Sequence, residues 1–348
     1  MLDVLDEPVI RYAYPANPES GGILELEPGL VWLRMPLPFA LDHINLWLLA
    51  DGAGWVMVDT GAGTDDARAI WERTLERVVG SARVERVIVT HLHPDHVGNA
   101  GWLCDRLSAT LWMSREEYML CRVLCADTGR PAPPEGKAFY HGAGFPPEAM
   151  HRYEKMFGMF GRFVASLPES YRRLKDRDRI EIGERSWEVV VGRGHSPEHA
   201  CLYDADNNVL IGGDQLLPTI SSHIGVYPTE PDADPLAEWL SSLKHMESRV
   251  PDDVLVLPSH GRPFRGAHAR LDQLQREHEA ALEKLLEMCR EPRRAVDVFP
   301  ALFRSRVREN TYVMAAGESI AHLNYLRNQK LIELWTDADG VNWYQASA

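Results

Sequence analysis

Three histidines and an aspartate are crowded into the stretch THLHPDH, directly after the apolar run VERVIV. His91 and His93 lie two residues apart, so in an extended chain both imidazoles point to the same side and can reach one ion. Asp95 and His96 follow at the expected start of a helix, for which Pro94 suits the first turn. These two side chains turn elsewhere and could serve a second ion. The stretch therefore predicts a metal site, with the number of ions left open.

Three further segments place a histidine or an aspartate directly after an apolar strand pattern. The segments are VVVGRGH, VLIGGD and VLVLPSH, and they end on His195, Asp214 and His260. Each of these residues has a glycine beside it, which lets the backbone turn sharply and come close to a ligand. Because loops that follow strands gather along one edge of a sheet, we expect these side chains to join those of the first stretch.

The elements around these motifs alternate between strand and helix patterns. Residues 23–60 contain apolar, β-rich runs with a hairpin signal at DGAG, and residues 64–79 show helical spacing with Thr64 as the N-cap. A buried strand is expected over 83–90, a helix over 93–107 and a further strand over 109–114. This alternation predicts layered α/β structure.

Two segments depart from that rhythm. Residues 115–175 combine helical patterns with a stretch rich in Pro and Gly, which favours a lid or substrate-binding cap. From Ala267 a long helix, two shorter helical patterns and a hairpin with DADG at its turn resemble a winged helix. The prediction is a domain over 1–265, with the cap inserted at about 115–175, and a winged-helix-like domain over 266–348.

Composition narrows the classes of partner. A net charge of −14 argues against a polyanion as the main ligand, and the tail from Arg270 onward balances 11 basic against 12 acidic residues. No apolar run is long enough to span a bilayer, and the N-terminus lacks the features of a signal peptide. Five cysteines without a CxxC pair suit free thiols. We expect a cytoplasmic protein with a small-molecule substrate, and leave homo-oligomers open.

The order HxHxDH, GH, GD and SHG, preceded by WVMVDTG, resembles the metallo-β-lactamase superfamily over residues 23–265. The resemblance implies a four-layered αβ/βα sandwich with its site along one edge of the two sheets. It also implies two divalent metal ions, Zn²⁺ first, with Fe or Mn as alternatives. The implied ligands are His91, His93 and His195 for one ion, Asp95, His96 and His260 for the other, and Asp214 between them.

The resemblance gives roles to two other residues. Asp59, in WVMVDTG, would orient a loop or a ligand histidine. His199 matches the second histidine of a GHxxGH-like motif, although Glu198 stands where the family has glycine. We therefore expect His199 to support the site rather than to bind metal.

Substrate contacts are less well marked. Arg262 and Arg265, just beyond His260, could pair with a carboxylate or phosphate of the substrate. His223 could reach the cleft, although an ordinary hydrogen-bonded histidine is the favoured interpretation.

The implied reaction is a hydrolysis in which a hydroxide shared by two metals attacks a thioester, ester or lactone. Asp95 and Asp214 are the predicted catalytic residues, and Asp95 would also take up a proton. An endoribonuclease or phosphodiesterase is the first alternative, because a winged-helix-like tail behind this domain resembles the β-lactamase-like protein 2 group. A mononuclear iron sulfur dioxygenase would leave three ligands without a role, and a DNA-binding regulator does not suit the acidic balance.

Overall fold

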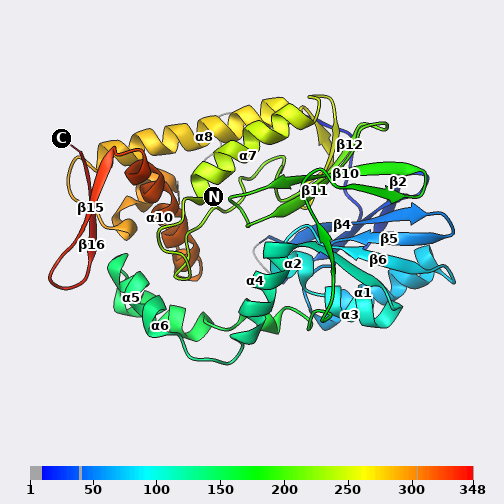
Figure 1. Ribbon diagram of the computed structural model, residues 1–348, viewed down its shortest axis with the longest axis horizontal. Helices are drawn as coiled ribbons and strands as arrows, with labels where there is room; N and C mark the ends of the chain where they lie inside the picture. The colour runs from blue at the N-terminus through cyan, green and yellow to red at the C-terminus, as the bar shows by residue number, and fades with distance from the viewer. Residues whose placement is uncertain (1–9, 39–40, 304, 348) are drawn as a thin grey trace.

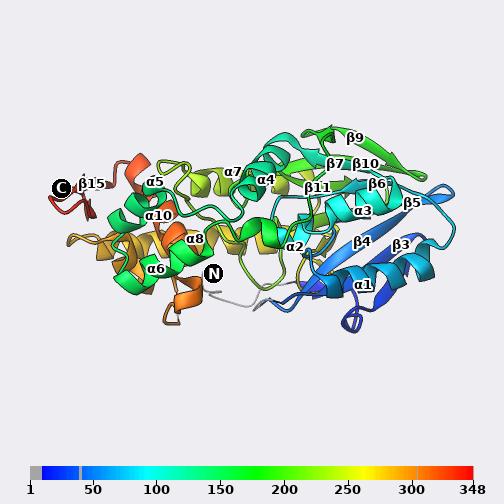
Figure 2. The same ribbon diagram turned by 90° about the horizontal axis from the view of Figure 1, so that it is seen from below.

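The computed structural model describes residues 10–38, 41–303 and 305–347. Two seven-stranded sheets lie face to face and carry helices on their outer sides, as Figures 1 and 2 show. This is the four-layered α/β sandwich that the motifs predicted. Within the described ranges, no helix has both the length and the apolar character needed to span a membrane. The first nine residues of the predicted first domain, on which the expectation about a signal peptide depends, lie outside these ranges.

The first sheet is built from the N-terminal half of the chain. Its neighbours are antiparallel from β2 to β5 and parallel from β5 to β8. In sheet order the strands are β2 (Ile23–Glu27), β3 (Leu30–Pro36), β4 (His43–Asp51), β5 (Gly54–Val58), β6 (Val84–Ile88), β7 (Thr110–Ser114) and β8 (Arg172–Leu174).

The second sheet is built from the C-terminal half of the chain and one short N-terminal strand. Its pairs are antiparallel except for β12 and β13, which run parallel. In sheet order the strands are β1 (Arg11–Tyr12), β14 (Phe264–Arg265), β13 (Leu255–Pro258), β12 (Val209–Gly213), β11 (His199–Asp204), β10 (Arg185–Gly192) and β9 (Arg179–Ile182).

Alternating side chains produce the layers. In β3, Leu30 and Trp32 belong to the apolar layer between the sheets, whereas Val31 and Leu33 face the outer helices. The period of two in a strand sends neighbouring side chains to opposite faces, so a strand with apolar residues at both positions must be covered on both sides. The first sheet is covered by α1 (Asp65–Thr74) with its continuation η1 (Leu75–Val79), and by α3 (Ala100–Leu107).

The helix expected over 93–107 is divided in two. Pro94 occupies the first position of α2 (Pro94–Val97), and α3 begins only at Ala100. The side chain of Asn99 donates to the carbonyl oxygen of Ala62 at 2.6 Å, and its backbone N–H donates to that of Gly61 at 3.1 Å. These bonds turn the chain toward the neighbouring loop instead of continuing the helix.

The cap contains one more helix than its composition suggests. Between α4 (Arg115–Ala126) and α6 (Pro147–Met156), the stretch rich in Pro and Gly forms α5 (Pro134–Gly142), with a proline in its first turn. A single 3-10 turn, η2 (Phe160–Arg162), follows α6.

The cap helices pack on the C-terminal segment, although some 150 residues separate them in sequence (Figures 1 and 2). The backbone N–H of Val296 donates to the carbonyl oxygen of Ala143 at 3.2 Å, and Nε2 of His141 lies 2.8 Å from the carbonyl oxygen of Asp339. The C-terminal elements are α8 (Ala267–Met288), η3 (Ala295–Val298), α9 (Phe299–Leu302), η4 (Glu309–Thr311), α10 (Tyr312–Asn328), β15 (Ile332–Thr336) and β16 (Asn342–Ala346).

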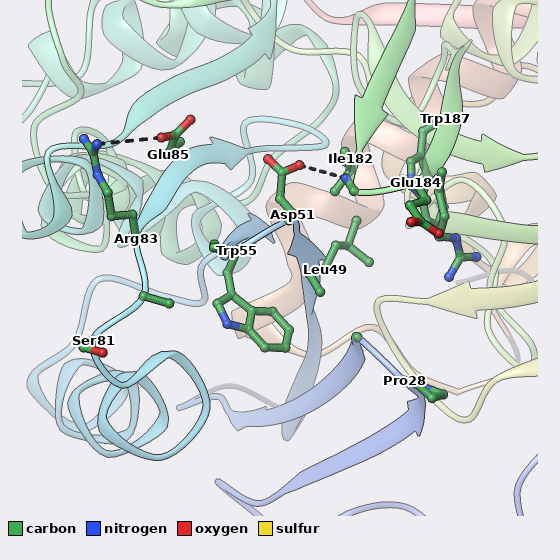
Figure 3. A pocket seen from close by; sticks show the side chains of 18 residues that line it. Pro28, Leu49, Asp51, Trp55, Ser81, Arg83, Glu85, Ile182, Glu184 and Trp187 are labelled. Carbon is green, nitrogen blue, oxygen red and sulfur yellow. Dashed lines mark hydrogen bonds and ion pairs between the residues drawn. The ribbon is translucent and has the colours of Figure 1, made fainter.

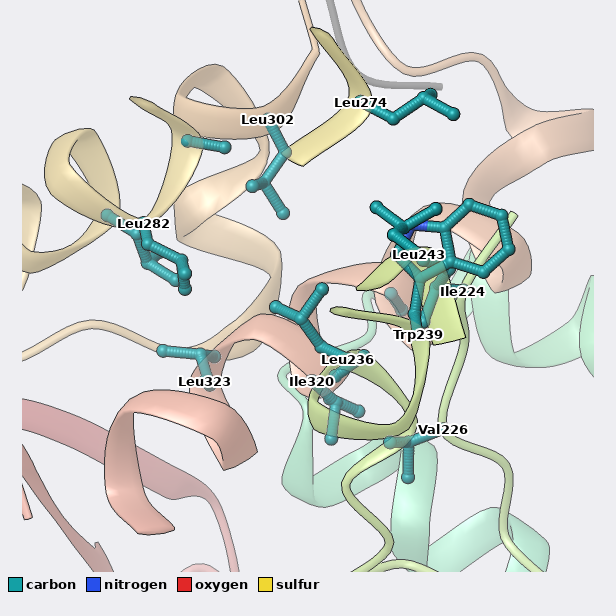
Figure 4. Packing of buried hydrophobic residues seen from close by; sticks show 14 of the residues in the cluster. Ile224, Val226, Leu236, Trp239, Leu243, Leu274, Leu282, Leu302, Ile320 and Leu323 are labelled. Carbon is teal, nitrogen blue, oxygen red and sulfur yellow. The ribbon is translucent and has the colours of Figure 1, made fainter. Parts of the chain in front are cut away.

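One apolar core joins the second sheet, the cap and the C-terminal helices. Figure 4 shows Trp239 of α7 (Pro235–Arg249), Leu274 of α8 and Ile320 of α10 in this cluster. The predicted long helix from Ala267 and the terminal hairpin are both present. The winged-helix comparison and the domain boundary at 265 stay predictions.

A pocket of about 1020 Å³ lies at one end of the sandwich (Figure 3). Its lining includes Asp51 at the end of β4 and Gly183 in the turn between β9 and β10, which belong to different sheets. The nine residues of β4 span about 26 Å at about 3.3 Å per residue, so this pocket is remote from His43 at the other end of the strand.

Candidate metal centre

Loops at one edge of the two sheets bring the predicted ligands together. Residues 91–96 follow β6 in the first sheet, while His195, Asp214 and His260 follow β10, β12 and β13 in the second. The seven side chains form two groups, and the potential ligand atoms within each group lie within 4.8 Å of one another. The groups are His91, His93, His195 and Asp214, and Asp95, His96 and His260.

Asp214 lies between the two groups. Its Oδ1 is 3.4 Å from Nε2 of His96 and 3.4 Å from Nε2 of His260. Its Oδ2 is 3.4 Å from Nε2 of His195 and 3.9 Å from Nε2 of His91. Each carboxylate oxygen of Asp214 therefore faces one of the two groups.

Three of the histidines have a carbonyl or carboxylate oxygen next to the ring nitrogen that faces away from the centre. Nδ1 of His195 lies 2.7 Å from the carbonyl oxygen of His223, and Nδ1 of His260 lies 2.7 Å from that of His43. Nδ1 of His96 lies 2.8 Å from Oδ2 of Asp59. In a neutral imidazole, an oxygen next to Nδ1 keeps the proton there, so that Nε2 is the nitrogen available to a metal ion.

The atoms that face the centre fit a bound cation. In the described part of the chain, Nε2 of His96, Nε2 of His260 and Oδ1 of Asp214 are buried and have no hydrogen-bond partner. Buried polar atoms are almost always paired, so unpaired polar atoms that converge on one centre call for a ligand between them. Imidazole nitrogens and carboxylate oxygens are donors that suit Zn²⁺ and related divalent ions.

Burial and charge set the protonation of these donors. Burial lowers the pKa of His93 to about 3, which keeps its imidazole neutral and able to donate a lone pair. Burial alone would raise the pKa of Asp214, but His96 and His260 outweigh it and hold that pKa well below its usual value. The carboxylate of Asp214 is consequently charged at neutral pH.

Asp59 is hydrogen-bonded to the start of the loop that contains residues 91–96, as expected of a residue that orients this loop. Its Oδ1 accepts a hydrogen bond from the backbone N–H of Thr90 at 2.8 Å, and its Oδ2 also faces the Thr90 hydroxyl at 2.8 Å. Together with the bond to His96, these contacts fix the turn between β6 and the first predicted ligand.

His199 lies outside both groups and supports Asp214. The backbone N–H of Asp214 donates to Nε2 of His199 at 3.0 Å. Gly213 precedes it with φ +53°, and a Cβ there would lie 2.4 Å from the His199 ring. Only glycine allows the chain to pass so close to the imidazole in that conformation.

The predicted substrate residues are placed differently from one another. His223 is joined to the centre through its carbonyl oxygen, while its Nδ1 lies 3.3 Å from Oε2 of Glu318. The guanidinium of Arg262 lies 3.8 Å from the centre of the Tyr12 ring, and Arg265 donates to the carbonyl oxygen of Asp253. Both arginines are thus engaged by the protein itself.

Glu117 is a buried residue that the sequence patterns did not single out. Its Oε2 accepts from the backbone N–H of Leu92 at 2.9 Å, and its Oε1 accepts from the backbone N–H of Glu198 at 2.7 Å. Burial raises the pKa of Glu117. In the sequence it is one of two adjacent glutamates in a helix start, and nothing distinguishes it from Glu116.

The family described as "Metallo-beta-lactamase superfamily" matches residues 40–287, and "Metallo-beta-lactamase-like, C-terminal domain" matches residues 282–347. A crystal structure of a beta-lactamase domain protein from Burkholderia ambifaria superposes with a TM-score of 0.89 at 39% identity, covering 97% of this chain and 98% of that one.

Two curated relatives carry functional names. The "Probable metallo-hydrolase YqjP" of Bacillus subtilis is 26% identical over 90% of this chain and 96% of its own length. The "Acyl-coenzyme A thioesterase MBLAC2" of Bos taurus is 23% identical over 54% of this chain and 64% of its own length. The matched family covers most of the chain and all seven residues of the two groups, so this protein belongs to the metallo-β-lactamase superfamily and is a metal-dependent hydrolase.

Proposed function

We propose that the two groups bind two divalent metal ions, with Zn²⁺ preferred, and that the protein hydrolyses a thioester of a partly apolar acyl group. The position of Asp214, with one carboxylate oxygen toward each group, is the observation that carries the two-metal part. When bound, such ions lower the pKa of water and polarise the substrate carbonyl.

In this proposal Asp95 combines two tasks. Its Oδ2 lies 3.5 Å from Nε2 of His260 and 3.7 Å from Nε2 of His96, which suits a ligand of the second ion. Burial raises the pKa of Asp95, but His96 and His260 lower it by more, so that the group is a carboxylate at neutral pH. Its side chain keeps 18% of its surface exposed, and an oxygen of this carboxylate can take up a proton during hydrolysis.

Two observations support an acyl substrate. On α4, which begins beside the centre, Met119 and Val123 are 52% and 55% exposed and lie one turn apart on the same face. We infer that these exposed apolar side chains would contact an acyl chain bound at the centre. The relative from Bos taurus is named as an acyl-coenzyme A thioesterase, which fits this chemistry.

The test is a substrate panel on zinc-loaded protein: acyl-CoA, acyl-glutathione, lactone, phosphodiester and short RNA. We expect about two zinc ions per chain and the fastest turnover on an acyl-CoA. Turnover is measured as release of the free thiol. Asp214→Asn should lower turnover by at least about 100-fold, because even residues that only orient a metal ligand contribute 10–100-fold.

Other outcomes of the panel would point to the alternatives. Cleavage of RNA without any thioester turnover would make the thioesterase proposal wrong and favour the endoribonuclease. One iron per chain with oxygen uptake on a persulfide would favour the dioxygenase. Unchanged zinc content and turnover in Asp214→Asn would refute the shared-ligand assignment.

A further inference from the structure

The start of α4 is hydrogen-bonded to the two loops that carry the three histidines of the first group. Glu117, which is fully buried, binds the backbone N–H of Leu92 with one oxygen and that of Glu198 with the other. Leu92 lies between His91 and His93, and Glu198 lies three residues after His195. One carboxylate thus spans two loops that come from different sheets.

Glu198 returns the contact. Its Oε2 accepts from the backbone N–H of Glu116 at 3.0 Å, so the loop holds the helix start as the helix holds the loop. Its Oε1 lies 3.4 Å from Nη2 of Arg193, which partly neutralises the buried charge. We call the pair Glu117 and Glu198 the glutamate clasp. It also gives a purpose to the glutamate that stands where the family's pattern has glycine.

We propose that the glutamate clasp positions the ligands of one metal ion of the two, the ion held by His91, His93 and His195. This inference rests on the two-metal site proposed above. Both N–H groups that the clasp accepts belong to the loops of that group. The second group has its own anchors, since His96 is held by Asp59 and His260 by the carbonyl oxygen of His43.

The chemistry of the clasp requires a carboxylate at position 117. Two N–H donors point at its two oxygens, and hydrogen bonds to a charged acceptor are about twice as strong as neutral ones. Glutamine has the same shape but only one oxygen, so Glu117→Gln sets an NH₂ group against one of the two N–H donors. That loop then shifts by the distance needed to relieve the clash, and its ligand histidine shifts with it.

The experiment compares Glu117→Gln with Glu116→Gln, using Zn²⁺ alone and a chromophoric chelator as competitor. We expect Glu117→Gln to bind one zinc ion about 10–100-fold more weakly than the wild type and the other with unchanged affinity. Glu116→Gln should bind both ions normally, because its half-exposed side chain faces Arg193 and its backbone N–H is retained. Thermal unfolding of the metal-free proteins verifies that each variant is folded.

Glu198→Gln provides a second measurement that does not alter position 117. It should weaken the same ion, and the double variant should lose less than the sum of the two single losses, because both residues fasten one junction. Equal weakening of both ions, unchanged binding in both variants, or an equal loss in Glu116→Gln would overturn the clasp. If the wild type itself bound no zinc, the two-metal site would be wrong, and the role of the clasp with it.

Discussion

Asp59 has a backbone conformation that few residues with a Cβ adopt. Its φ is +61°, and its carboxylate meets Thr90 and His96 directly behind the predicted second metal. Asparagine and aspartate adopt this left-handed region more readily than other residues with a Cβ. The left-handed conformation thus places the Asp59 carboxylate against Thr90 and His96. Asparagine also adopts this conformation, so the carboxylate can be replaced without disturbing the turn.

Asp59→Asn should keep the backbone and lose the negative charge beside Nδ1 of His96. We expect affinity for one zinc ion to fall by about 10–100-fold, because the outer partner of a ligand histidine fixes both its orientation and its basicity. Zinc competition with a chelator measures this effect. Asp65→Asn, on a fully exposed side chain of α1, is the matched control. Zinc affinity equal to that of the wild type would show that Asp59 only shapes the turn.

At the scale of elements, the end of the sandwich remote from the metal centre is held by an ion pair. Asp51, at the end of β4, accepts a hydrogen bond at 2.8 Å from the backbone N–H of Gly183, in the turn between β9 and β10 of the opposite sheet (Figure 3). It also pairs with Arg86 of β6. Burial raises the pKa of Asp51, but the bonds from Gly183 and Arg86 outweigh it, and the pKa is lowered. The turn between β9 and β10 is thereby joined to the first sheet.

Asp51→Asn should lower the free energy of unfolding at pH 7 by about 0.5–1 kcal/mol, since the pair is only partly buried. A carboxyl group whose pKa is lower in the folded state stabilises above its unfolded pKa of about 3.9, and this contribution is lost as the pH falls through the folded value. The difference between wild type and variant should therefore narrow below about pH 4. Urea unfolding at pH 7 and at pH 3.5 measures it.

The control for this prediction lies in the same pocket. Glu85 is 63% exposed and is 4.0 Å from Arg83, so Glu85→Gln should leave stability nearly unchanged. A difference between wild type and Asp51→Asn that stayed constant from pH 7 to pH 3.5 would contradict the ionic explanation.

At the scale of the whole molecule, the C-terminal helices are part of the catalytic fold. The second sheet, the cap and helices α8 and α10 share one apolar core (Figure 4). Arg270 of α8 is fully buried and donates to the carbonyl oxygens of Leu217 and Ile220 at 2.8 and 2.9 Å. These carbonyls belong to the loop between Asp214 and His223, so α8 supports the loop that begins at Asp214.

A chain shortened to residues 1–266 should therefore fail to unfold cooperatively, because it exposes the outer face of the second sheet. Thermal unfolding followed by near-UV circular dichroism tests this. A cooperative transition within a few degrees of the full chain would show that the first domain folds independently.

Single substitutions in the same core give a finer measurement. Leu274→Ala, at a side chain that is 1% exposed, should lower the free energy of unfolding by about 2–5 kcal/mol. Met314→Ala, where the side chain is 49% exposed, should change it by less than about 0.5 kcal/mol. Equal effects at the two positions would contradict the shared core.

Layered α/β structure was predictable from the sequence for a physical reason, whereas the full ligand set and its division into two groups were implied by the resemblance to the family. Strand patterns and their following His or Asp residues are local signals, and the ends of neighbouring strands meet without any knowledge of side-chain packing. Glu117 was not predictable, since a glutamate in the first turn of a helix is ordinary until the opposite loop is in place. The helix α5 was not predicted because its segment is rich in Pro and Gly, although proline is common in the first turn of a helix, where Pro134 lies.

Contacts between distant segments could not be predicted from the sequence either. The cap packs on residues that follow it by about 150 to 200 positions, and no local pattern marks such a partner. For the same reason Arg262 and Arg265 were predicted as substrate contacts from their place beside His260, whereas their guanidinium groups meet Tyr12 and Asp253. A role for them in substrate binding stays a prediction.

The division of the ligands between the two sheets has a consequence for the lifetime of the protein. Residues 91–96 follow a strand of one sheet, and His195, Asp214 and His260 follow strands of the other. An ion held by both sets cross-links the halves of the chain, and at a free concentration of 100 times Kd it adds about 2.7 kcal/mol to stability. A typical domain has only about 5–15 kcal/mol in all. The supply of metal would then govern how long each molecule resists proteolysis, before any substrate is present.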